Sequence, residues 1–225
     1  MLEKKITNLK SKIVKCNKCI RLVKFRKKIA KEKRKQFANE TYWGKPVTGF
    51  GDINAKILFV GLAPAAHGGN RTGRIFTGDK SSDFLYKCLY KANISNQNFS
   101  NKINDGLKLK NAFITAALKC VPPEDKPLKN ELNNCFSFFK KEIDLLKNIK
   151  VIIALGKIAF DACVFFYRSN YNFKEKVKFG HNKKYNLPNN IVLMGCYHPS
   201  PRNVNTGRIN EKKMTNLFKK ILKLV

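Results

Sequence analysis

Acidic residues are scarce in this sequence. Its 225 residues include 15 aspartates and glutamates against 46 lysines and arginines, so the formal net charge is +31. A folded domain with this charge repels itself and attracts polyanions over long distances. The composition therefore predicts a nucleic acid as the leading partner and an anionic membrane surface as the second candidate.

Long apolar runs are also missing. No run approaches the roughly 18 residues of a membrane-spanning helix. The N-terminus lacks an apolar segment followed by a small-residue cleavage site. Cysteines number seven, an odd count that favours thiols or metal ligands over a disulfide framework. We expect a cytoplasmic protein with no membrane partner, located at the nucleoid when it is bound to DNA.

Short apolar runs alternate with segments of helical periodicity along the chain. Strands are predicted at 56–61, 112–116, 151–156 and 191–196, and helices at 81–92, 128–146, 157–167 and 210–224. Apolar strands between helices are typical of a parallel sheet covered on both faces. We therefore predict one α/β domain over residues 1–225, with its functional site at the carboxyl ends of the strands.

Residues 1–40 are predicted to form a basic helical arm. Apolar residues recur at spacings of three and four from Leu2 to Ile13. After Cys16 and Cys19, a second helical run carries a dense cluster of lysines and arginines. Such a run is either a solvated helix face or a surface that contacts phosphates.

Two strand ends are followed by unusual loops. The first loop, 61–79, is rich in glycine and alanine, so its backbone amides can approach an anion or a base edge. The alternative is an ordinary glycine-rich loop. It lacks the Gly-Lys-Ser/Thr of a P-loop, and no nucleotide cofactor is expected. The second loop, 198–208, begins with His198. A lone histidine is more often structural, but this place at the end of a strand favours a functional role.

Four of the seven cysteines form two pairs. Cys16 and Cys19 make a Cys-x-x-Cys motif, and 14 residues separate Cys120 from Cys135. Four thiolates from two pairs suit either a structural zinc ion or an iron–sulfur cluster. Spacing alone favours zinc, because structural zinc sites are commoner. The other three cysteines lie among apolar residues and are predicted to be small core residues.

Five motifs occur in the order found in a known family. They are Gly-Leu-Ala-Pro-Ala from Gly61, His-Gly-Gly-Asn-Arg-Thr-Gly-Arg from His67, Phe-Thr-Gly-Asp from Phe76, Cys-x-Pro-Pro from Cys120 and His-Pro-Ser-Pro-Arg-Asn from His198. With this combination the chain resembles the type-5, or b-type, uracil-DNA glycosylases of the uracil-DNA glycosylase superfamily. The resemblance extends from Cys16 to Arg208.

The resemblance implies a three-layer α/β/α fold with a four-stranded parallel sheet, together with a [4Fe–4S] cluster. The family's cluster-binding positions match Cys16, Cys19, Cys120 and Cys135. In such enzymes the cluster is structural, and here it would tie the arm of residues 1–40 to the core. The resemblance thus favours iron–sulfur over zinc.

The family reaction is hydrolysis of the N-glycosidic bond of a damaged base that is flipped out of DNA, which leaves an abasic site. His198 matches the catalytic histidine that donates a hydrogen bond to uracil O2 and stabilises the leaving uracil anion. Phe76 matches the residue that stacks on the base, with a core phenylalanine as the alternative. Gly61, Leu62 and Ala63 match the pocket wall, where other glycosylase families carry a polar residue that positions the water.

The group that positions the water must therefore lie elsewhere. Asp79 matches an acidic position of the family, and it is either this group or a helix N-cap. Backbone carbonyls, or DNA phosphates that stabilise the sugar cation, are the alternatives. Asp125 stands near the base where the family pattern has asparagine, so an amide donor is lost and a negative charge is added.

The resemblance also implies a DNA-contacting surface. The residues that match the loop entering the duplex, where it fills the gap left by the flipped nucleotide, are Pro199, Ser200, Pro201, Arg202 and Asn203. Arg71, Arg74 and Arg202 are predicted phosphate contacts. His67 is expected either at the pocket mouth or in a structural role within its loop.

Three functions are compatible with these features. The first, which the resemblance favours, is a monomeric, monofunctional glycosylase acting on double-stranded DNA that contains uracil or other deaminated bases such as hypoxanthine. The second is a non-catalytic iron–sulfur DNA-binding module of the same fold, suggested by the apolar Leu62 and Ala63 and by Asp125. The third is a zinc-stabilised basic RNA-binding protein.

Overall fold

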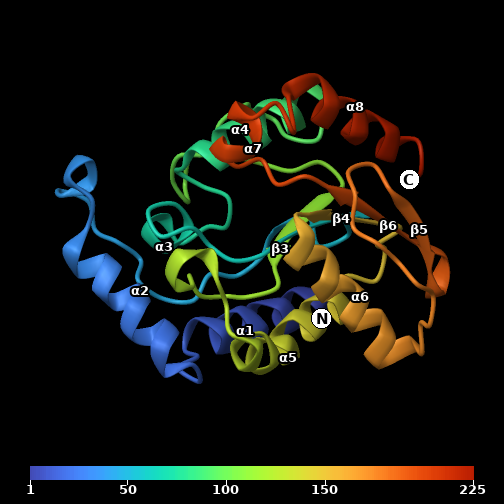
Figure 1. Ribbon diagram of the computed structural model, residues 1–225. Helices are drawn as coiled ribbons and strands as arrows, with labels where there is room; N and C mark the ends of the chain where they lie inside the picture. The colour runs from blue at the N-terminus through green and yellow to red at the C-terminus, as the bar shows by residue number, and fades with distance from the viewer.

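A computed structural model describes the whole chain, residues 1–225. One sheet runs through the molecule with helices on both faces (Figure 1). Its strand order is β1-β3-β2-β4-β6-β5. The strands are β1 (Phe50–Gly51), β2 (Ile57–Gly61), β3 (Ala112–Ala116), β4 (Val151–Leu155), β5 (Lys184–Leu187) and β6 (Ile191–Cys196).

Helices occupy most of the segments between the strands. The α-helices are α1 (Leu2–Val14), α2 (Ile20–Glu32), α3 (Gly69–Thr72), α4 (Lys80–Lys91), α5 (Lys129–Leu145), α6 (Lys157–Tyr171), α7 (Pro201–Asn205) and α8 (Glu211–Leu222). Single turns of 3-10 helix are η1 (Lys35–Phe37), η2 (Pro123–Asp125) and η3 (Pro188–Asn190). None of the helices is both long enough and apolar enough to cross a membrane.

The central strands β3, β2, β4 and β6 are parallel, as predicted. Every residue of β2, β3 and β4 is buried, which explains their continuous apolar runs. The prediction of a sheet with four parallel strands was nevertheless incomplete. Two antiparallel strands, β1 and β5, extend it to a mixed sheet of six. β1 pairs only two residues with β3, and β5 is mostly exposed, so neither carries an apolar signal in the sequence.

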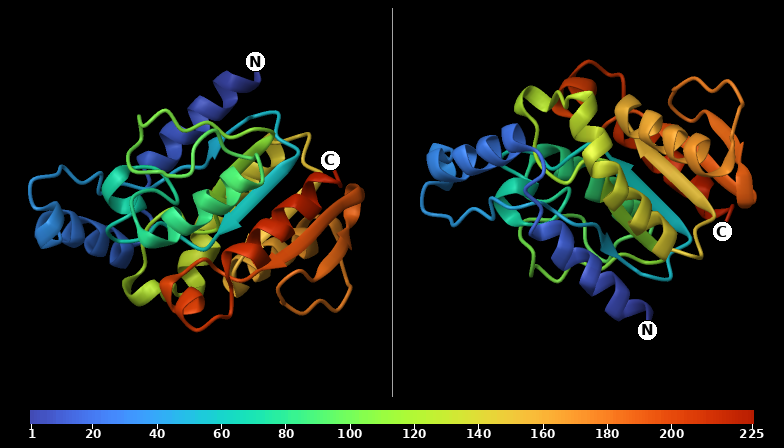
Figure 2. Two further views of the ribbon diagram at one scale, coloured as in Figure 1. Left: turned by 90° about the horizontal axis from the view of Figure 1, so that it is seen from above. Right: turned by 90° about the horizontal axis from the view of Figure 1, so that it is seen from below.

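The two faces of the sheet are covered by different helices. Alternate residues of β2 point to opposite faces. Ile57 and Phe59 pack with α4 and α8, whereas Leu58 and Val60 pack with α5 and α6. The views from above and below show these two helix layers (Figure 2). The sequence thus correctly predicted a sheet between two layers of helices.

The N-terminal helices attach to one side of this body. α1 packs on α5 through Ile6, Leu9 and Ile13, which are buried. α2 projects away from the sheet (blue in Figure 1), and most of its lysines are exposed. Only Leu22 and Arg26 of α2 are buried. The lysine cluster is therefore a solvated face that remains available to a phosphate backbone.

Candidate active site

A pocket of about 400 Å³ lies at the carboxyl edge of the parallel strands. Loops that follow β2, β4 and β6 bring its walls together. Its lining residues are Leu62, Ala63, Ala65, Phe76, Asp79, Ser81, Asp125, Leu155, Gly156, Lys157, Ile158, Ala159, His198, Ser200 and Pro201. The pocket thus unites the catalytic and most of the substrate-binding residues that were predicted.

His198 lies in this pocket, two residues beyond the end of β6. The side-chain amide of Asn203 donates to the His198 carbonyl oxygen at 2.9 Å, which fixes the loop. Gly156 faces it, and a Cβ there would lie 3.5 Å from His198 Cβ. Burial lowers the pKa of His198 to about 4, so the imidazole is neutral near pH 7. A neutral imidazole retains one N–H donor.

Phe76 forms the opposite wall. Its ring centroid lies 6.0 Å from that of His198, with the planes tilted by 35°. The ring lies against Gly61, where an added Cβ would be only 2.7 Å from Phe76 Cε2. Gly61 is therefore required by the close approach of this ring. Phe76 itself is buried and has φ of +48°, a backbone conformation that bulky residues rarely adopt.

The loop after β2 supplies the apolar part of the wall. The Gly61 carbonyl accepts from the Ala117 amide at 3.0 Å, and the Leu62 carbonyl accepts from the Leu118 amide at 2.9 Å. These bonds continue the β2–β3 pairing beyond the strands and hold Leu62 and Ala63 at the pocket. Both side chains are apolar, so this part of the wall offers no side-chain hydrogen-bonding group.

Asp79 both caps a helix and lines the pocket. Its Oδ1 accepts from the Ser82 amide at 2.9 Å, and Ser82 Oγ accepts from the Asp79 amide at 3.0 Å, which forms a capping box at the start of α4. Burial raises the pKa of Asp79 above its ordinary value despite these bonds. The two roles considered for Asp79 are therefore compatible.

Asp125 lies at the exposed rim of the same pocket. It ends η2, where Glu124 and Asp125 both have positive φ, +53° and +56°. Asparagine and aspartate are the residues that tolerate this conformation best. Asp125 in place of asparagine thus suits this turn, while an amide donor at the pocket rim is exchanged for a negative charge.

A larger cleft of about 700 Å³ adjoins the pocket and shares Asp79 with it. Only two of its 13 lining residues are hydrophobic. A flipped base needs apolar and aromatic surfaces on which to stack. The pocket between Phe76 and His198 offers these surfaces, and the polar cleft does not.

Sequence comparisons agree with this geometry. The sequence model of the Uracil DNA glycosylase superfamily matches residues 48–223. A type-5 uracil-DNA glycosylase from Mycobacterium tuberculosis is 39% identical over 220 residues, which cover 97% of this chain and 81% of that protein. The chain belongs to the type-5 uracil-DNA glycosylases.

Relatives from distant organisms give the same assignment. The type-5 uracil-DNA glycosylase of Thermus thermophilus is 41% identical over 88% of either chain. That of Pyrobaculum aerophilum is 37% identical over 93% of this chain and 89% of its own. The family resemblance and the superfamily fold predicted from the motifs are confirmed.

In this family member the expected duplex-entering loop forms a short helix. Ser200 Oγ caps α7 by accepting from the Asn203 amide at 3.4 Å. Pro199 is buried, whereas Pro201 and Arg202 are exposed beside the pocket. Ser200 and Asn203 thus shape the loop, and Pro201 and Arg202 present its free surface.

Arg71 and Arg74, expected at the phosphates, are turned inward. Arg71 pairs with Glu40, donates to the His67 carbonyl at 2.7 Å and lies 3.8 Å from the Phe37 ring centroid. Arg74 is 6% exposed and all its nitrogens donate within the protein. In this geometry both side chains brace the loop from within the protein, and their low exposure does not favour the predicted phosphate contacts.

His67 also has a structural position. Its Nδ1 lies 3.0 Å from the hydroxyl of Tyr42, and the rings meet edge to face. Burial, with Arg34 and Arg71 nearby, lowers the pKa of His67. His67 does not line the pocket, so the loop-structuring alternative describes it.

The four paired cysteines line one small cavity between α2, α5 and the segment after β3. Three of their sulfurs accept hydrogen bonds. The donors are Arg26 Nη1 to Cys120 at 3.1 Å, the Lys119 amide to Cys135 at 3.3 Å, and Asn134 Nδ2 to Cys19 at 3.6 Å. No three histidine, cysteine, aspartate or glutamate side chains lie close enough together to hold a single metal ion.

Arg26 lies beside the cysteine-lined cavity and was not predicted as part of it. It is 3% exposed, donates to the Cys16 carbonyl and to Asn17 Oδ1, pairs with no carboxylate, and leaves its Nε without a partner. A buried cation without a counter-ion is costly. Its sequence signal was its spacing of four residues from Leu22, the other buried residue of α2.

A second missed component is a buried ion pair behind the cavity. Lys119 pairs with Glu142, and both side chains are nearly inaccessible. Glu142 also accepts from the Gly49 amide at 3.1 Å and from Thr115 Oγ1 at 2.5 Å. This network joins the end of β3 to α5 and therefore fixes the segment that carries Cys120.

Proposed function

We propose that this protein removes uracil from DNA by hydrolysing its N-glycosidic bond, leaving an abasic site. One observation carries the proposal. In a member of the type-5 family, a neutral His198 and the Phe76 ring face each other across a base-sized pocket, with their ring centroids 6.0 Å apart. The neighbouring loops supply polar groups and an apolar wall for one flipped base.

His198 is assigned the stabilisation of the leaving group. As the glycosidic bond breaks, the electron pair moves to the base and negative charge grows on uracil O2. An N–H donor held at that oxygen lowers the barrier, because it needs no reorganisation at the moment of reaction. The low pKa of His198 keeps the imidazole neutral, so the residue acts as a donor without transferring a proton.

Asp79 is assigned the positioning of the attacking water. A carboxylate has two oxygens and about four acceptor sites, and the helix cap uses Oδ1. Asp79 therefore keeps acceptor capacity on the pocket wall. A water held there would attack the sugar carbon as the base leaves, and its proton would pass to the carboxylate.

The substrate is assigned as double-stranded DNA, bound by a monomer. The net charge of +31 and the exposed lysines of α2 support a large electrostatic contribution to binding. Pro201 and Arg202, which are exposed beside the pocket, would fill the gap left by the flipped nucleotide. The same charge supports association with chromosomal DNA in the nucleoid.

Other deaminated bases such as hypoxanthine are included in the proposal. The wall formed by Leu62 and Ala63 carries no side-chain donor or acceptor. A pocket rejects a wrong base strongly when that base leaves polar groups of the pocket without a hydrogen-bond partner. An apolar wall has no such groups, so it discriminates only weakly between related bases.

We also propose that Cys16, Cys19, Cys120 and Cys135 hold a [4Fe–4S] cluster. All four line one cavity, and the match of these positions to the cluster-binding positions of the family favours iron–sulfur over zinc. The buried Arg26 supports an anionic group there. When bound, the cluster supplies a cross-link between the N-terminal arm and the segments around β3 and α5, and it takes no part in the glycosidic chemistry.

The test is base release from a duplex carrying one uracil, with a hypoxanthine duplex and an undamaged duplex alongside. Release of uracil is expected from the wild type. A folded protein that binds DNA with strong salt dependence but releases neither base would instead be a non-catalytic binding module. Iron and sulfide analysis tests the cluster, and a colourless protein with stoichiometric zinc would overturn that assignment.

A further inference from the structure

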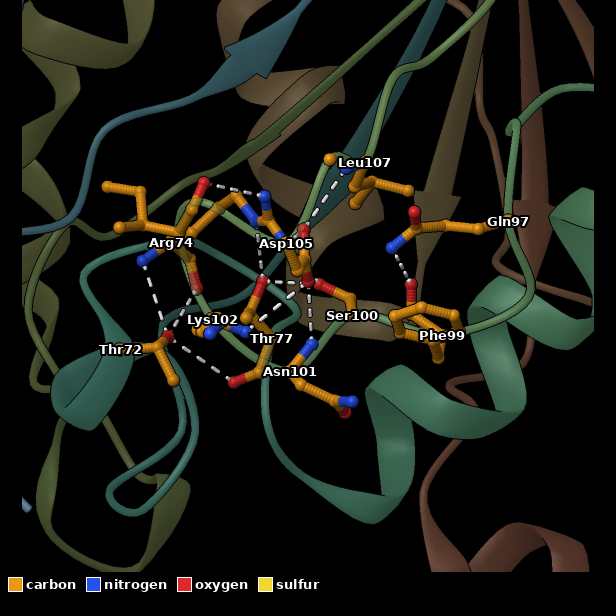
Figure 3. Close-up of polar contacts among 12 residues, drawn as sticks. Thr72, Arg74, Thr77, Gln97, Phe99, Ser100, Asn101, Lys102, Asp105 and Leu107 are labelled. Atoms are coloured by element: carbon orange, nitrogen blue, oxygen red, sulfur yellow. Dashed lines mark hydrogen bonds and ion pairs between the residues drawn. The ribbon is translucent and has the colours of Figure 1, made fainter.

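Phe76 needs support from outside its own segment. Its φ of +48° lies in the left-handed region, and it belongs to neither a helix nor a strand. A bulky side chain holds such a backbone conformation only where surrounding contacts enforce it. The loop of residues 95–107 lies beside this segment and provides those contacts (Figure 3).

Arg74 is the centre of these contacts. Its Nε donates to Thr77 Oγ1 at 3.0 Å and its Nη1 to the Ile103 carbonyl at 3.1 Å. Its Nη2 donates to Ser100 Oγ at 2.9 Å and to both carboxylate oxygens of Asp105, at 2.8 and 2.7 Å. The planar guanidinium thus reaches the residue after Phe76 and the neighbouring loop at once.

Asp105 completes the connection from the loop side. Its carboxylate accepts the backbone amides of Asn101 at 2.8 Å, Lys102 at 3.3 Å and Leu107 at 3.1 Å, as well as Arg74. The side chains of Arg74 and Asp105 are only 6% and 4% exposed. This pair is shielded from salt and water, so it holds its geometry in solution.

Further bonds fix both flanks of Phe76. After it, Thr77 Oγ1 lies 2.7 Å from Ser100 Oγ, and the Gly78 amide donates to the Ser100 carbonyl at 2.7 Å. Before it, the Arg74 carbonyl lies 3.3 Å from Thr72 Oγ1 (Figure 3). Phe76 therefore sits between two anchored positions.

We propose that Arg74 and Asp105 are positioning residues that hold the Phe76 ring on the pocket wall opposite His198, where a flipped base would stack on it. The inference rests on the proposed function of the pocket. Arg74 acts through Phe76 and touches neither DNA nor the base. Its exchange should therefore slow base removal while leaving the electrostatic part of DNA binding intact.

The discriminating variant is Arg74→Lys, which keeps the charge but loses the fork of donors. A phosphate contact tolerates lysine, whereas a multidentate brace does not. We expect single-turnover uracil excision to slow by about tenfold or more, with unchanged affinity and salt dependence on undamaged duplex. Arg168→Lys, on the exposed end of α6, is the matched control and should excise at the wild-type rate.

A double-mutant cycle separates positioning from general stability. If Arg74 acts through the ring, Arg74→Lys should slow excision much less in a Phe76→Ala background, by under about threefold. Ser100→Ala removes one partner of both Arg74 and Thr77 and provides a milder variant in the same cycle. If the thermal transition of Arg74→Lys shows that this variant does not fold, Ser100→Ala replaces it in the cycle.

Each outcome decides the matter. Absence of uracil release by the wild type overturns the proposed function, and this inference with it. If the wild type is active, wild-type excision by Arg74→Lys makes Arg74 a simple cation and overturns the inference. Equal slowing in the presence and absence of the Phe76 ring also overturns it, because a general structural defect would then be the cause.

Discussion

Replacement of His198 by alanine tests the centre of the proposed mechanism. The exchange removes the imidazole but leaves the loop intact, because Asn203 holds the backbone carbonyl of His198 rather than its ring. Ser200 still caps α7, and Gly156 still flanks the site. The variant therefore loses one hydrogen-bond donor in a pocket whose walls remain in place.

The expected magnitude follows from the environment of that donor. A preorganised donor to a developing oxyanion contributes about 3–4 kcal/mol to the lowering of the barrier. This corresponds to a loss of roughly 10²–10³-fold in the rate of the chemical step. His198→Gln keeps a neutral N–H donor on a more flexible side chain, and its rate should fall between those of the wild type and His198→Ala.

The assay is single-turnover excision from a duplex with one uracil, with protein in excess, so that product release does not limit the rate. Binding to undamaged duplex is measured in parallel and should be unchanged. A loss of excision without loss of binding identifies a contact made in the transition state. Wild-type excision by His198→Ala would refute the assignment.

The pH profile provides an independent check. Burial lowers the pKa of His198 to about 4, so the imidazole stays neutral from pH 8 down to pH 5. The active form is the neutral one, and the excision rate should show no inflection near the ordinary histidine pKa of about 6.5. A fall in rate on acidification through that value, absent in His198→Gln, would show that the imidazole titrates normally and would refute this account.

Three further predictions concern neighbouring features. Gly61→Ala places a Cβ 2.7 Å from Phe76 Cε2, so single-turnover excision should slow by about tenfold with DNA affinity retained. Arg26→Gln removes the buried cation beside the cysteines, and iron content per protein should fall below that of the wild type. Lys119→Met leaves Glu142 buried without its partner and should lower the free energy of unfolding by about 3–5 kcal/mol in denaturant titrations; Lys119→Met combined with Glu142→Leu should recover much of it.

The fold was largely predictable because its central signal is local. The parallel strands β2, β3 and β4 are buried on both faces, so they are continuous apolar runs that can be recognised without any partner. The edge strands had no such signal. β1 is two residues long, and β5 is a polar segment that becomes a strand only because β6 lies beside it.

Some residues of the candidate site could likewise be predicted from the sequence, whereas the placement of others could not. His198 was recognisable because it lies just beyond the end of an apolar strand, where parallel sheets place their ligands. Arg71 and Arg74 were predicted at the DNA because arginine is a common phosphate contact. Their inward direction depends on Glu40 and Asp105, each about 31 residues away in sequence, and on a loop without periodicity.

The sequence alone thus determined what depends on composition and local order: the positive charge, the buried strands, the two cysteine pairs and the loops at the strand ends. The tertiary structure decided which charges became internal, which aspartate capped a helix while lining the pocket, and how Phe76 was held. Those outcomes depend on which distant groups meet in space, because a buried charge must find its partner within the fold and no local pattern specifies that partner.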